Sequence, residues 1–365
     1  MPSGRRTDSS RRRLAAVFRA MEDLGLKQTV VTDETALFYL LGQRVEPMER
    51  CAALLLTEGG VAHAFMNRLF RFHPPQGVVL HEYQDGEDVY AMLAAHLSPG
   101  ELGIDGSWPS RHTIALLERR RDLVPVLGSA PVDLARTRKD EEEQALLLQA
   151  GETADRALAF GFSRLSPEES EADLARALDG FFLAQGGRQA GQYQVVCFGP
   201  SAADPHHVPG EARPRPGDAV LLDLVYPING YWCDVTRTVF YRRVSPRHRE
   251  IYQLVRRAQQ TGAALVRPGV KLRDVDAAVR GVIAAGGYGD AFLTRTGHGV
   301  GLSVHEAPEV SASSETTAEP GMVFSIEPGI YLSGDVGIRI EDLVLVTEDG
   351  CRRLTHFPRE LQIAG

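Results

Sequence analysis

The chain has 365 residues and a formal net charge of −8, with 43% hydrophobic and 24% charged residues. This length suits two domains better than one, and the composition is that of a globular protein. The acidic balance argues against a nucleic-acid partner, because nucleic-acid-binding proteins usually carry a basic stripe. No apolar run in the sequence approaches ~18 residues, so we expect neither a signal peptide nor a membrane partner.

The cysteines are scattered along the chain without CxxC spacing. They are Cys51, Cys197, Cys233 and Cys351. This pattern fits buried thiols in a reducing compartment better than a disulfide framework. We therefore expect a cytoplasmic protein.

The N-terminal segment is basic, with five arginines in the stretch GRRTDSSRRR. Serine, threonine, glycine and aspartate accompany them, and the stretch has no apolar run that could pack in a core. We predict that residues 1–13 form a disordered, solvated tail.

The following segment, residues 14–135, alternates helical and strand patterns and is predicted to be an α/β domain. The patterns favour helices over 11–24 and 89–97 and from about 111, strands over 29–31, 78–83 and 102–105, and a hairpin turning at 58–60. A dense charge run over residues 136–143 then breaks the alternation. We place the domain boundary at its start, and we expect Asp140 to cap the helix that follows.

In the second domain, residues 136–365, the predicted order of two helices followed by a hairpin occurs twice. Helices over about 140–161 and 168–185 precede one hairpin, and helices over about 246–266 and 271–285 precede another. Ser166-Pro167 and Ser245-Pro246 are typical helix starts. Because each half contributes one pair of carboxylates, the repeat predicts a site between two similar halves.

The first carboxylate pair is Asp223 and Asp234, on either side of the turn at Pro227–Gly230. Strands paired symmetrically about this turn place the two aspartates opposite each other. Opposed side chains of an antiparallel ribbon lie roughly 4.5–5.5 Å apart at Cβ. The apolar run around Asp223 indicates burial, and a buried carboxylate needs a partner.

The second pair is Glu327 and Glu341, centred on Gly334, so the same argument places them opposite each other. Like charges held face to face destabilise a sheet unless something neutralises them. His298 lies between two glycines, which allow the backbone to approach a site closely. The four carboxylates and this histidine predict a centre for divalent metal, most simply for two ions.

Further histidines lie nearby in the sequence. His305 follows His298 by seven residues, and His206 and His207 are adjacent in a proline-rich loop. A histidine is more often a satisfied core or surface residue than a ligand. The residues alone therefore leave these roles open.

A set of sequence segments, in order, carries a resemblance to a known family. They carry all five candidate ligands and form four strings, namely D-x10-DVTRT, GHGVGLSVHEAP, SIEPGIY and GIRIED. Together they resemble the pita-bread metallopeptidases, which include Xaa-Pro dipeptidases (prolidases), aminopeptidase P and methionine aminopeptidases. The resemblance implies an α+β pita-bread (creatinase/aminopeptidase) catalytic domain over residues 136–365. The α/β N-terminal domain over 14–135 is similar to the creatinase-type domain of prolidases and aminopeptidase P.

The resemblance also implies how the ligands are shared. Asp223 would hold one ion, Asp234 and Glu341 would bridge both, and His298 and Glu327 would complete the second. Oxygen-rich ligands with one imidazole suit Mn²⁺, Co²⁺ or Zn²⁺, and the family implies manganese first. Two such ions polarise a carbonyl group and lower the pKa of a water molecule.

Other site residues follow from the same resemblance. Glu327 would take the proton of the attacking water. His206, which precedes Asp223 by 17 residues, and His305 match two histidines that contact the substrate; His305 would stabilise the gem-diolate or relay a proton. Tyr331 and Arg339 match positions close to the site, where we expect them to support substrate binding.

The sequence departs from the family pattern in two places. Val225 stands where the family has glycine, and Thr294 stands where prolidase-like members commonly have histidine. Arg295, next in the chain, is placed to meet the free carboxylate of a dipeptide; its alternative role is an ion pair with a nearby acidic side chain. This arginine and the short chain favour a dipeptidase over the alternative, aminopeptidase P.

We therefore expect a homodimeric enzyme that hydrolyses small peptides at an Xaa-Pro bond. A catalytically weak or inactive peptide-binding protein is the alternative of another class. Degraded metal ligands would indicate it, and all five ligand positions are intact.

Overall fold

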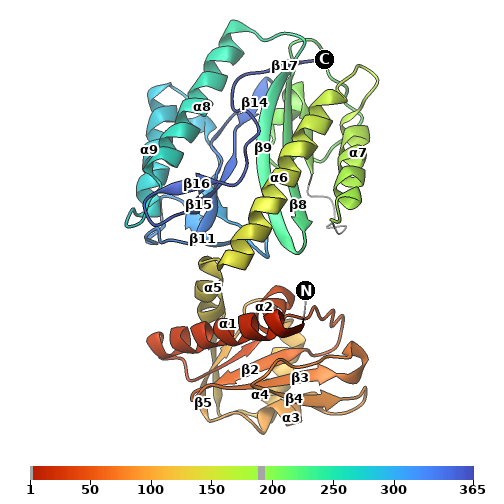
Figure 1. Ribbon diagram of the computed structural model, residues 1–365, viewed down its shortest axis with the longest axis vertical. Coiled ribbons are helices and arrows are strands. Elements are labelled where there is room, and N and C mark those ends of the chain that lie inside the picture. The colour runs from red at the N-terminus through yellow and green to blue at the C-terminus, as the bar shows by residue number, and fades with distance from the viewer. Residues whose placement is uncertain (1–2, 188–193) are drawn as a thin grey trace. The chain divides into compact units, whose positions relative to one another are not determined.

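The computed structural model describes residues 3–187 and 194–365. The chain divides into two compact units, Met1–Arg136 and Thr137–Gly365 (Figure 1). The division falls within the charge run that the sequence offers as a boundary. Each unit has its own sheets and core, and the carboxylate hairpins belong to the second.

The N-terminal unit contains a six-stranded mixed sheet in the order β4-β3-β2-β1-β5-β6. Its strands are β1 (Gln28–Val31), β2 (Ala53–Thr57), β3 (Val61–Asn67), β4 (Val78–Tyr83), β5 (Gly100–Ile104) and β6 (Leu123–Leu127). Its helices are α1 (Ser3–Asp23), α2 (Glu34–Leu41), α3 (Val89–Ala94), α4 (Ser110–Arg119) and α5 (Ala130–Thr137), the last of which runs across the division. The predicted hairpin at 58–60 joins antiparallel β2 and β3. Strand β6 escaped prediction because Pro125 interrupts its pattern, and proline is tolerated at a sheet edge.

Helix α1 corrects the expectation of a disordered tail over residues 1–13. The helix begins at Ser3, while residues 1 and 2 lie outside the described part of the chain. Ser9 and Ser10 are buried together with Leu14 and Val17. Arg13 donates to the carbonyl oxygen of Tyr39. The basic segment therefore extends the amphipathic helix by packing its small side chains, a contribution that a search for large apolar residues misses.

The described residues of the second unit form three sheets: β17-β9-β8-β7, β11-β10-β12-β15-β16 and the two-stranded β13-β14. The strands of the first sheet are β7 (Val195–Phe198), β8 (Ala219–Ile228), β9 (Tyr231–Tyr241) and β17 (Ile363–Ala364). The others are β10 (Gly297–Gly299), β11 (Glu306–Val310), β12 (Val323–Ile326), β13 (Gly329–Leu332), β14 (Val336–Arg339), β15 (Asp342–Val346) and β16 (Cys351–Arg353).

The α-helices in the described part of this unit come in two pairs, as the repeated order predicts. They are α6 (Glu141–Ser163), α7 (Glu171–Ala184), α8 (Pro246–Leu265) and α9 (Leu272–Ala285). Apolar residues of α6 and α7 form one core with β7, β8 and β9, and those of α8 and α9 form another with β13 and β14. Each carboxylate hairpin is therefore backed by its own pair of helices (Figure 1).

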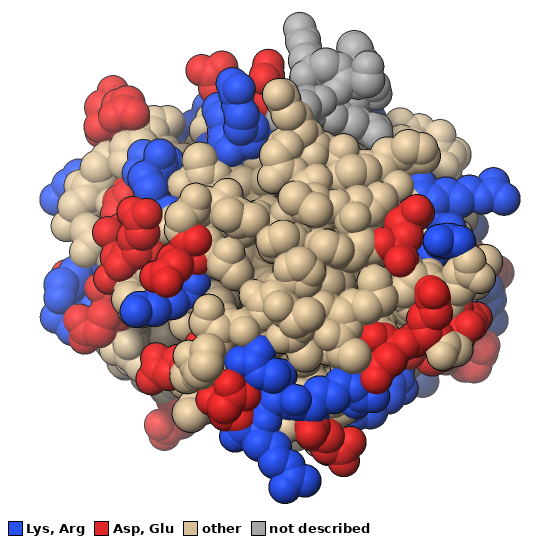
Figure 2. Space-filling model, turned by 90° about the horizontal axis from the view of Figure 1, so that it is seen from below, with Lys and Arg blue, Asp and Glu red and all other residues tan. Residues whose placement is uncertain are grey.

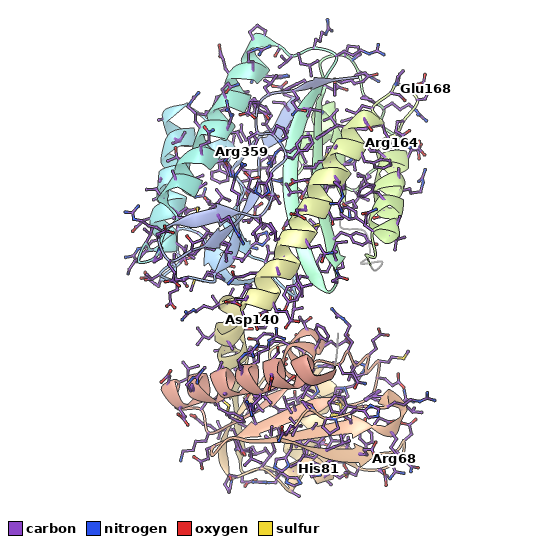
Figure 3. All side chains as sticks on the ribbon, viewed as in Figure 1. Arg68, His81, Asp140, Arg164, Glu168 and Arg359 are labelled. Atoms are coloured by element: carbon purple, nitrogen blue, oxygen red, sulfur yellow. The ribbon has the colours of Figure 1, made fainter. Side chains whose placement is uncertain are left out.

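Two of the helix starts are as predicted and one is wrong. Asp140 caps α6 in a capping box with Glu143, and Ser245 caps α8. Helix α7 begins three residues later than predicted, because Ser170 forms the capping box with Asp173. The labelled Glu168 lies before that helix (Figure 3).

Charges of both signs lie next to one another around the rim of the face in Figure 2, about a largely uncharged centre. This mixture differs from the basic stripe of nucleic-acid-binding proteins. None of the helices in the described part of the chain combines the length and apolar character that a membrane span requires.

Candidate metal centre

The β8–β9 ribbon carries both aspartates on one face, but not directly opposite each other. Asp223 pairs with Thr236, and Asp234 pairs with Val225. The strands turn at Asn229-Gly230, where both residues have positive φ, as a two-residue hairpin turn requires. The expected register is therefore wrong by two residues. Because side chains alternate with a period of two, the aspartates still share a face and meet diagonally.

The second hairpin has the predicted register. Strand β12 pairs with β15 through Ile326 and Asp342, and β13 pairs with β14 through Gly329 and Arg339. Between these two pairs the same register places Glu327 across from Glu341. The β12–β15 ladder thus lies on one side of the two glutamates and the β13–β14 ladder on the other, and both have the same register.

The third part of the centre is β10, the strand of Gly297, His298 and Gly299. A Cβ atom on Gly297 would lie 1.9 Å from the Ser325 carbonyl oxygen, and one on Gly299 would lie 2.3 Å from that of Ala307. Both positions therefore exclude larger residues. The glycines allow β10 to lie between its neighbours and present His298 to the carboxylates.

The His298 ring is held in one orientation. Its Nδ1 lies 3.2 Å from the Gly299 carbonyl oxygen, which only accepts, so Nδ1 carries a proton. Nε2 then faces the site, 3.1 Å from Oε1 of Glu327 and 3.6 Å from Oδ2 of Asp234. Ligand atoms of Asp234, His298 and Glu341 all lie within 4.8 Å of one another. This is the spacing of a set of side chains able to surround a cation.

The carboxylates are crowded enough to disturb one another. Burial and the charges of nearby acids raise the pKa values of Asp234 and Glu341 well above the usual range. Burial also raises the pKa of Asp223, against the opposing effect of Arg339. Burial is again the largest single effect on Glu327 and acts in the same direction, but His298, Arg339 and Ser325 together outweigh it, and the pKa of Glu327 lies below its usual value.

Two buried carboxylate oxygens, Oδ1 of Asp223 and Oε1 of Glu341, have no hydrogen-bond partner in the described part of the chain. A buried polar atom without a partner costs free energy. Divalent cations would satisfy both oxygens and relieve the repulsion between the acids. The residues present therefore fit a metal centre.

A hydrogen-bond network behind the ligands fixes their orientation. Thr236 donates to Oε2 of Glu341 at 2.7 Å and accepts from Nε of Arg339 at 2.9 Å. Nη2 of Arg339 donates to Oδ2 of Asp223 at 2.6 Å, and Nη1 donates to the Tyr331 hydroxyl at 2.7 Å. The expected support of substrate by Tyr331 and Arg339 stays a prediction, since these groups are engaged with the site itself. The bond between Thr236 and Glu341 joins residues 105 positions apart, which no local pattern in the sequence indicates.

Arg237 holds the same region from the other side of the ribbon. Its side chain is buried, pairs with Asp342 at 2.6 Å and donates to the main-chain oxygen of Glu341. Asp342 also accepts from Gln259 and Thr355. The backbone that carries Glu341 is thus fixed by a buried ion pair one residue away.

The centre opens into a cavity of about 1030 Å³. All five predicted ligands line it, together with His206, His305 and Arg295. The His305 ring packs edge-on against His298, with centroids 4.1 Å apart. Burial, and then the charges of His298 and Arg295, lower the pKa of His305 to about 4.

The two adjacent histidines have different surroundings. His206 is exposed within the cavity lining. His207 also lines the cavity, but its Nε2 lies 2.7 Å from Oε2 of Glu171, a fully buried residue at the start of α7. Glu171 further accepts from the main-chain N–H of Phe198 and Gly210. This arrangement gives His207 a structural partner and leaves His206 the freer of the two.

Arg295 forms an ion pair with Glu309, Nη1 to Oε1, at 2.7 Å. This is the alternative role considered for it, although its side chain also borders the cavity. Thr294, in the position of the family histidine, lines the cavity too. Helix α7 contributes Asp179, whose pKa is raised by burial and which no pattern in the sequence singles out.

Comparisons with known proteins match both domains of the chain. Residues 145–348 match the model of metallopeptidase family M24, and residues 13–138 match the creatinase/prolidase N-terminal domain. The chain is 37% identical over 359 residues to a probable dipeptidase PepE of Mycobacterium tuberculosis, covering 96% of this chain and 95% of that protein.

Solved structures extend the similarity to the whole fold. The dipeptidase PepE of Mycobacterium ulcerans superposes with a TM-score of 0.91 at 36% identity, over 98% of both chains. A prolidase from Thermococcus sibiricus gives 0.89 at 31% identity, over 97% of this chain and 98% of that one. The expected two-domain architecture, an α/β N-terminal domain followed by a pita-bread catalytic domain, is confirmed.

Proposed function

The chain belongs to metallopeptidase family M24, and on that premise we propose that it hydrolyses the Xaa-Pro bond of dipeptides. The observation that carries this proposal is the convergence of four carboxylates and one imidazole on one cavity, with two buried carboxylate oxygens unpartnered among the residues described. Relatives described as a dipeptidase and a prolidase support the substrate class. The intact ligand set speaks against an inactive peptide-binding protein.

Two metal ions would be held by the five residues that converge on the cavity, namely Asp223, Asp234, His298, Glu327 and Glu341. Oxygen-rich ligands with a single imidazole favour Mn²⁺, with Co²⁺ or Zn²⁺ as alternatives. The bound ions would polarise the scissile carbonyl and lower the pKa of the attacking water.

Glu327 moves the proton in this mechanism. Its pKa lies below its usual value, so the carboxylate is ionised and able to accept a proton from water. The water oxygen bonds to the carbonyl carbon, the C–N bond then breaks, and the proton passes from Glu327 to the proline nitrogen. Ser325, which donates to Oε1 of Glu327 at 3.0 Å, keeps the carboxylate in place.

His305 and His206 act on the bound substrate. His305 is positioned by its contact with His298, and both histidines line the cavity. Hydrogen-bond donors aimed at developing negative charge stabilise a tetrahedral transition state. We assign this role to His305 and substrate contact to His206.

Arg295 gives the site its preference for dipeptides. A dipeptide carries its free carboxylate one residue beyond the scissile bond, and a guanidinium group pairs with a carboxylate bidentately. Arg295 borders the cavity while Nη1 bonds to Glu309. Its other nitrogens have no hydrogen-bond partner among the residues described, and we assign them to the substrate carboxylate. Aminopeptidase P activity is the second candidate. Its longer substrates continue beyond the proline, into the space where Arg295 would bind the carboxylate of a dipeptide.

Hydrolysis of Ala-Pro compared with Ala-Pro-Ala, in protein loaded with Mn²⁺, tests the proposed function. We expect Ala-Pro to be the better substrate by kcat/KM. Preference for Ala-Pro-Ala would make the protein an aminopeptidase, and absence of both activities in metal-loaded protein would contradict the proposal. A cytoplasmic location and a homodimer complete the proposal, on the resemblance to prolidases.

A further inference from the structure

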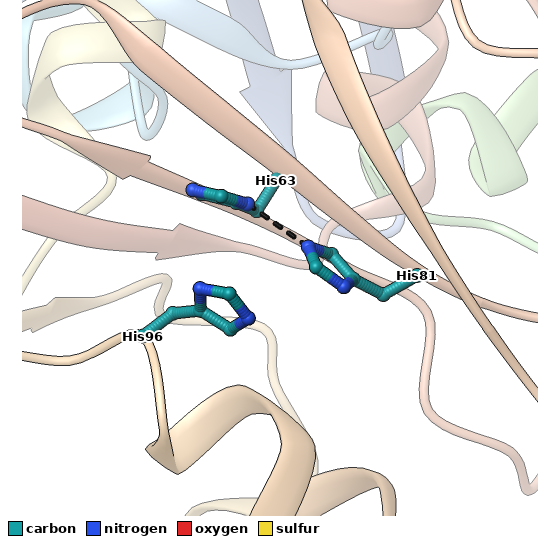
Figure 4. A group of neighbouring side chains, drawn as sticks. All are labelled: His63, His81 and His96. Atoms are coloured by element: carbon teal, nitrogen blue, oxygen red, sulfur yellow. Dashed lines mark hydrogen bonds between the residues drawn. The ribbon is translucent and has the colours of Figure 1, made fainter.

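Three histidines of the N-terminal unit converge at one edge of its sheet. His63 lies on β3, His81 lies on the edge strand β4, and His96 follows α3 (Figure 4). In the parallel β3–β4 pair, His63 is level with Val79, and His81 is level with Phe65. Because residues two apart share a face, both histidines point to the same side of the sheet.

The three rings are close enough to act together. Nδ1 of His63 lies 2.9 Å from Nε2 of His81. The His96 ring centroid lies 4.5 Å from each of the other two, and one nitrogen from each ring lies within 4.8 Å of the others. The rings thus surround one point from two strands and the end of a helix.

The core holds this cluster in place. The His81 ring stacks on Phe65 with centroids 4.7 Å apart, and Phe65 is fully buried with Leu93 and Leu97 around α3. His63 and His81 are partly buried, whereas His96 is exposed. Two of the three rings are therefore preorganised, and the third is free to adjust.

The surroundings favour neutral imidazoles. Burial, followed by the neighbouring histidines, lowers the pKa values of His63 and His81. Among the residues that the structure describes, no carboxylate lies within ion-pair distance of the three rings. A neutral imidazole is the form that binds a metal ion.

We propose that His63, His81 and His96 bind a divalent first-row transition-metal ion, with Zn²⁺ as the representative, and that water completes its coordination. Imidazole nitrogens suit zinc, nickel and copper, whereas the carboxylate-rich centre of the other unit suits manganese. Tetrahedral Zn–N bonds of about 2.0–2.1 Å separate ligand nitrogens by roughly 3.3 Å. The pair at 2.9 Å needs to open only slightly, while exposed His96 moves inward.

Such an ion would join parts of the unit that are far apart in sequence. It would link the edge strand β4 to β3 and to the segment after α3 (Figure 4). A ligand that binds only the folded state stabilises it by mass action. Zinc should therefore raise the unfolding temperature of the protein through this site.

Equilibrium dialysis of chelator-treated, full-length protein against buffered Zn²⁺, followed by metal analysis, tests the proposal. The test variant is His96→Ala, since the exposed ring can be removed without opening the core. The matched control is His73→Ala, an exposed histidine of the same unit. His96→Ala should bind about one Zn²⁺ fewer per chain than wild type and His73→Ala, and should lose part of the zinc-dependent rise in unfolding temperature.

The same comparison made in an Asp234→Ala background separates this site from the carboxylate centre. The loss of zinc caused by His96→Ala should persist there, whether or not the peptidase proposal holds. His63→Gln supplies a second variant, and circular dichroism checks that each protein is folded. Equal zinc binding by wild type, His96→Ala and His63→Gln would overturn the proposal and leave the three rings a hydrogen-bonded cluster.

Discussion

Thr236 donates a 2.7 Å hydrogen bond to Glu341, across the space between the two carboxylate hairpins. The same hydroxyl accepts from Nε of Arg339, whose Nη2 reaches Asp223. One threonine therefore connects ligands from both halves of the catalytic unit. The Thr236 hydroxyl has a single proton, which it donates to the carboxylate of Glu341, while its oxygen accepts from the guanidinium of Arg339. These roles fix the direction of each hydrogen bond in the network.

Replacement of Thr236 by valine should weaken the centre while preserving the shape of the side chain. The change leaves Oε2 of Glu341 and Nε of Arg339 without their buried partner. Outer contacts of this kind are worth roughly 10–100-fold in metal affinity or activity. Metal content and Ala-Pro turnover measure the effect, and Thr236→Ser should restore both. Unchanged metal binding and turnover in Thr236→Val would contradict the proposal that Thr236 orients the candidate metal ligands.

Acid should stabilise the metal-free protein. Burial and mutual repulsion raise the pKa values of Asp234 and Glu341, so the folded state holds these protons more tightly than the unfolded state. The contribution of Asp234 and Glu341 to the free energy of unfolding should therefore be greatest at pH values below the pKa of an ordinary carboxyl group. It should fall as pH rises through their raised folded values.

Thermal unfolding of chelated and Mn²⁺-loaded protein between about pH 5 and pH 8 measures this dependence. The loaded protein should lose less stability as pH rises, because the ions take the place of the protons. Asp234→Asn should flatten the curve of the chelated protein. Identical curves for chelated wild type and Asp234→Asn would contradict the assigned repulsion.

His206 and His305 should matter for turnover and not for metal binding. Alanine at either position should lower kcat/KM by roughly 10²-fold, because each removes a group placed to assist charge development or proton transfer. His207→Ala serves as the control: its partner is buried Glu171, so stability should fall while kcat/KM changes little. A larger fall in kcat/KM for His207→Ala than for His206→Ala would show that His207, and not His206, is the histidine that contacts the substrate.

Arg295→Ala should raise KM for Xaa-Pro dipeptides at least ~10-fold and harm amidated dipeptides much less, since only the former carry the carboxylate it would bind. Glu309→Gln is the matched variant, because it breaks the ion pair and leaves the guanidinium in place. If both variants damage both substrates equally, the pair is structural and aminopeptidase P becomes the better assignment.

The sequence predicted that Glu327 lies across from Glu341. This register is correct because both neighbouring ladders are centred on Gly334, as the prediction assumed. The sequence misplaced the aspartates because the Asn229-Gly230 turn, and not the midpoint of the carboxylates, sets the β8–β9 register. The network through Thr236 could not be foreseen, since it joins residues 105 positions apart. Nor could Asp179, whose place in the cavity depends on how α7 packs. Local patterns indicated the five candidate ligands, whereas contacts between residues distant in the sequence decide how these side chains are held.

The central claim is that the five ligands bind two ions that together support Xaa-Pro hydrolysis. The most direct test adds Mn²⁺ back to chelated protein while bound metal and Ala-Pro turnover are followed together. We predict that activity rises until about two Mn²⁺ are bound per chain, and that Asp234→Ala neither binds the pair nor recovers turnover. Full activity without bound metal, or in Asp234→Ala, would contradict the account.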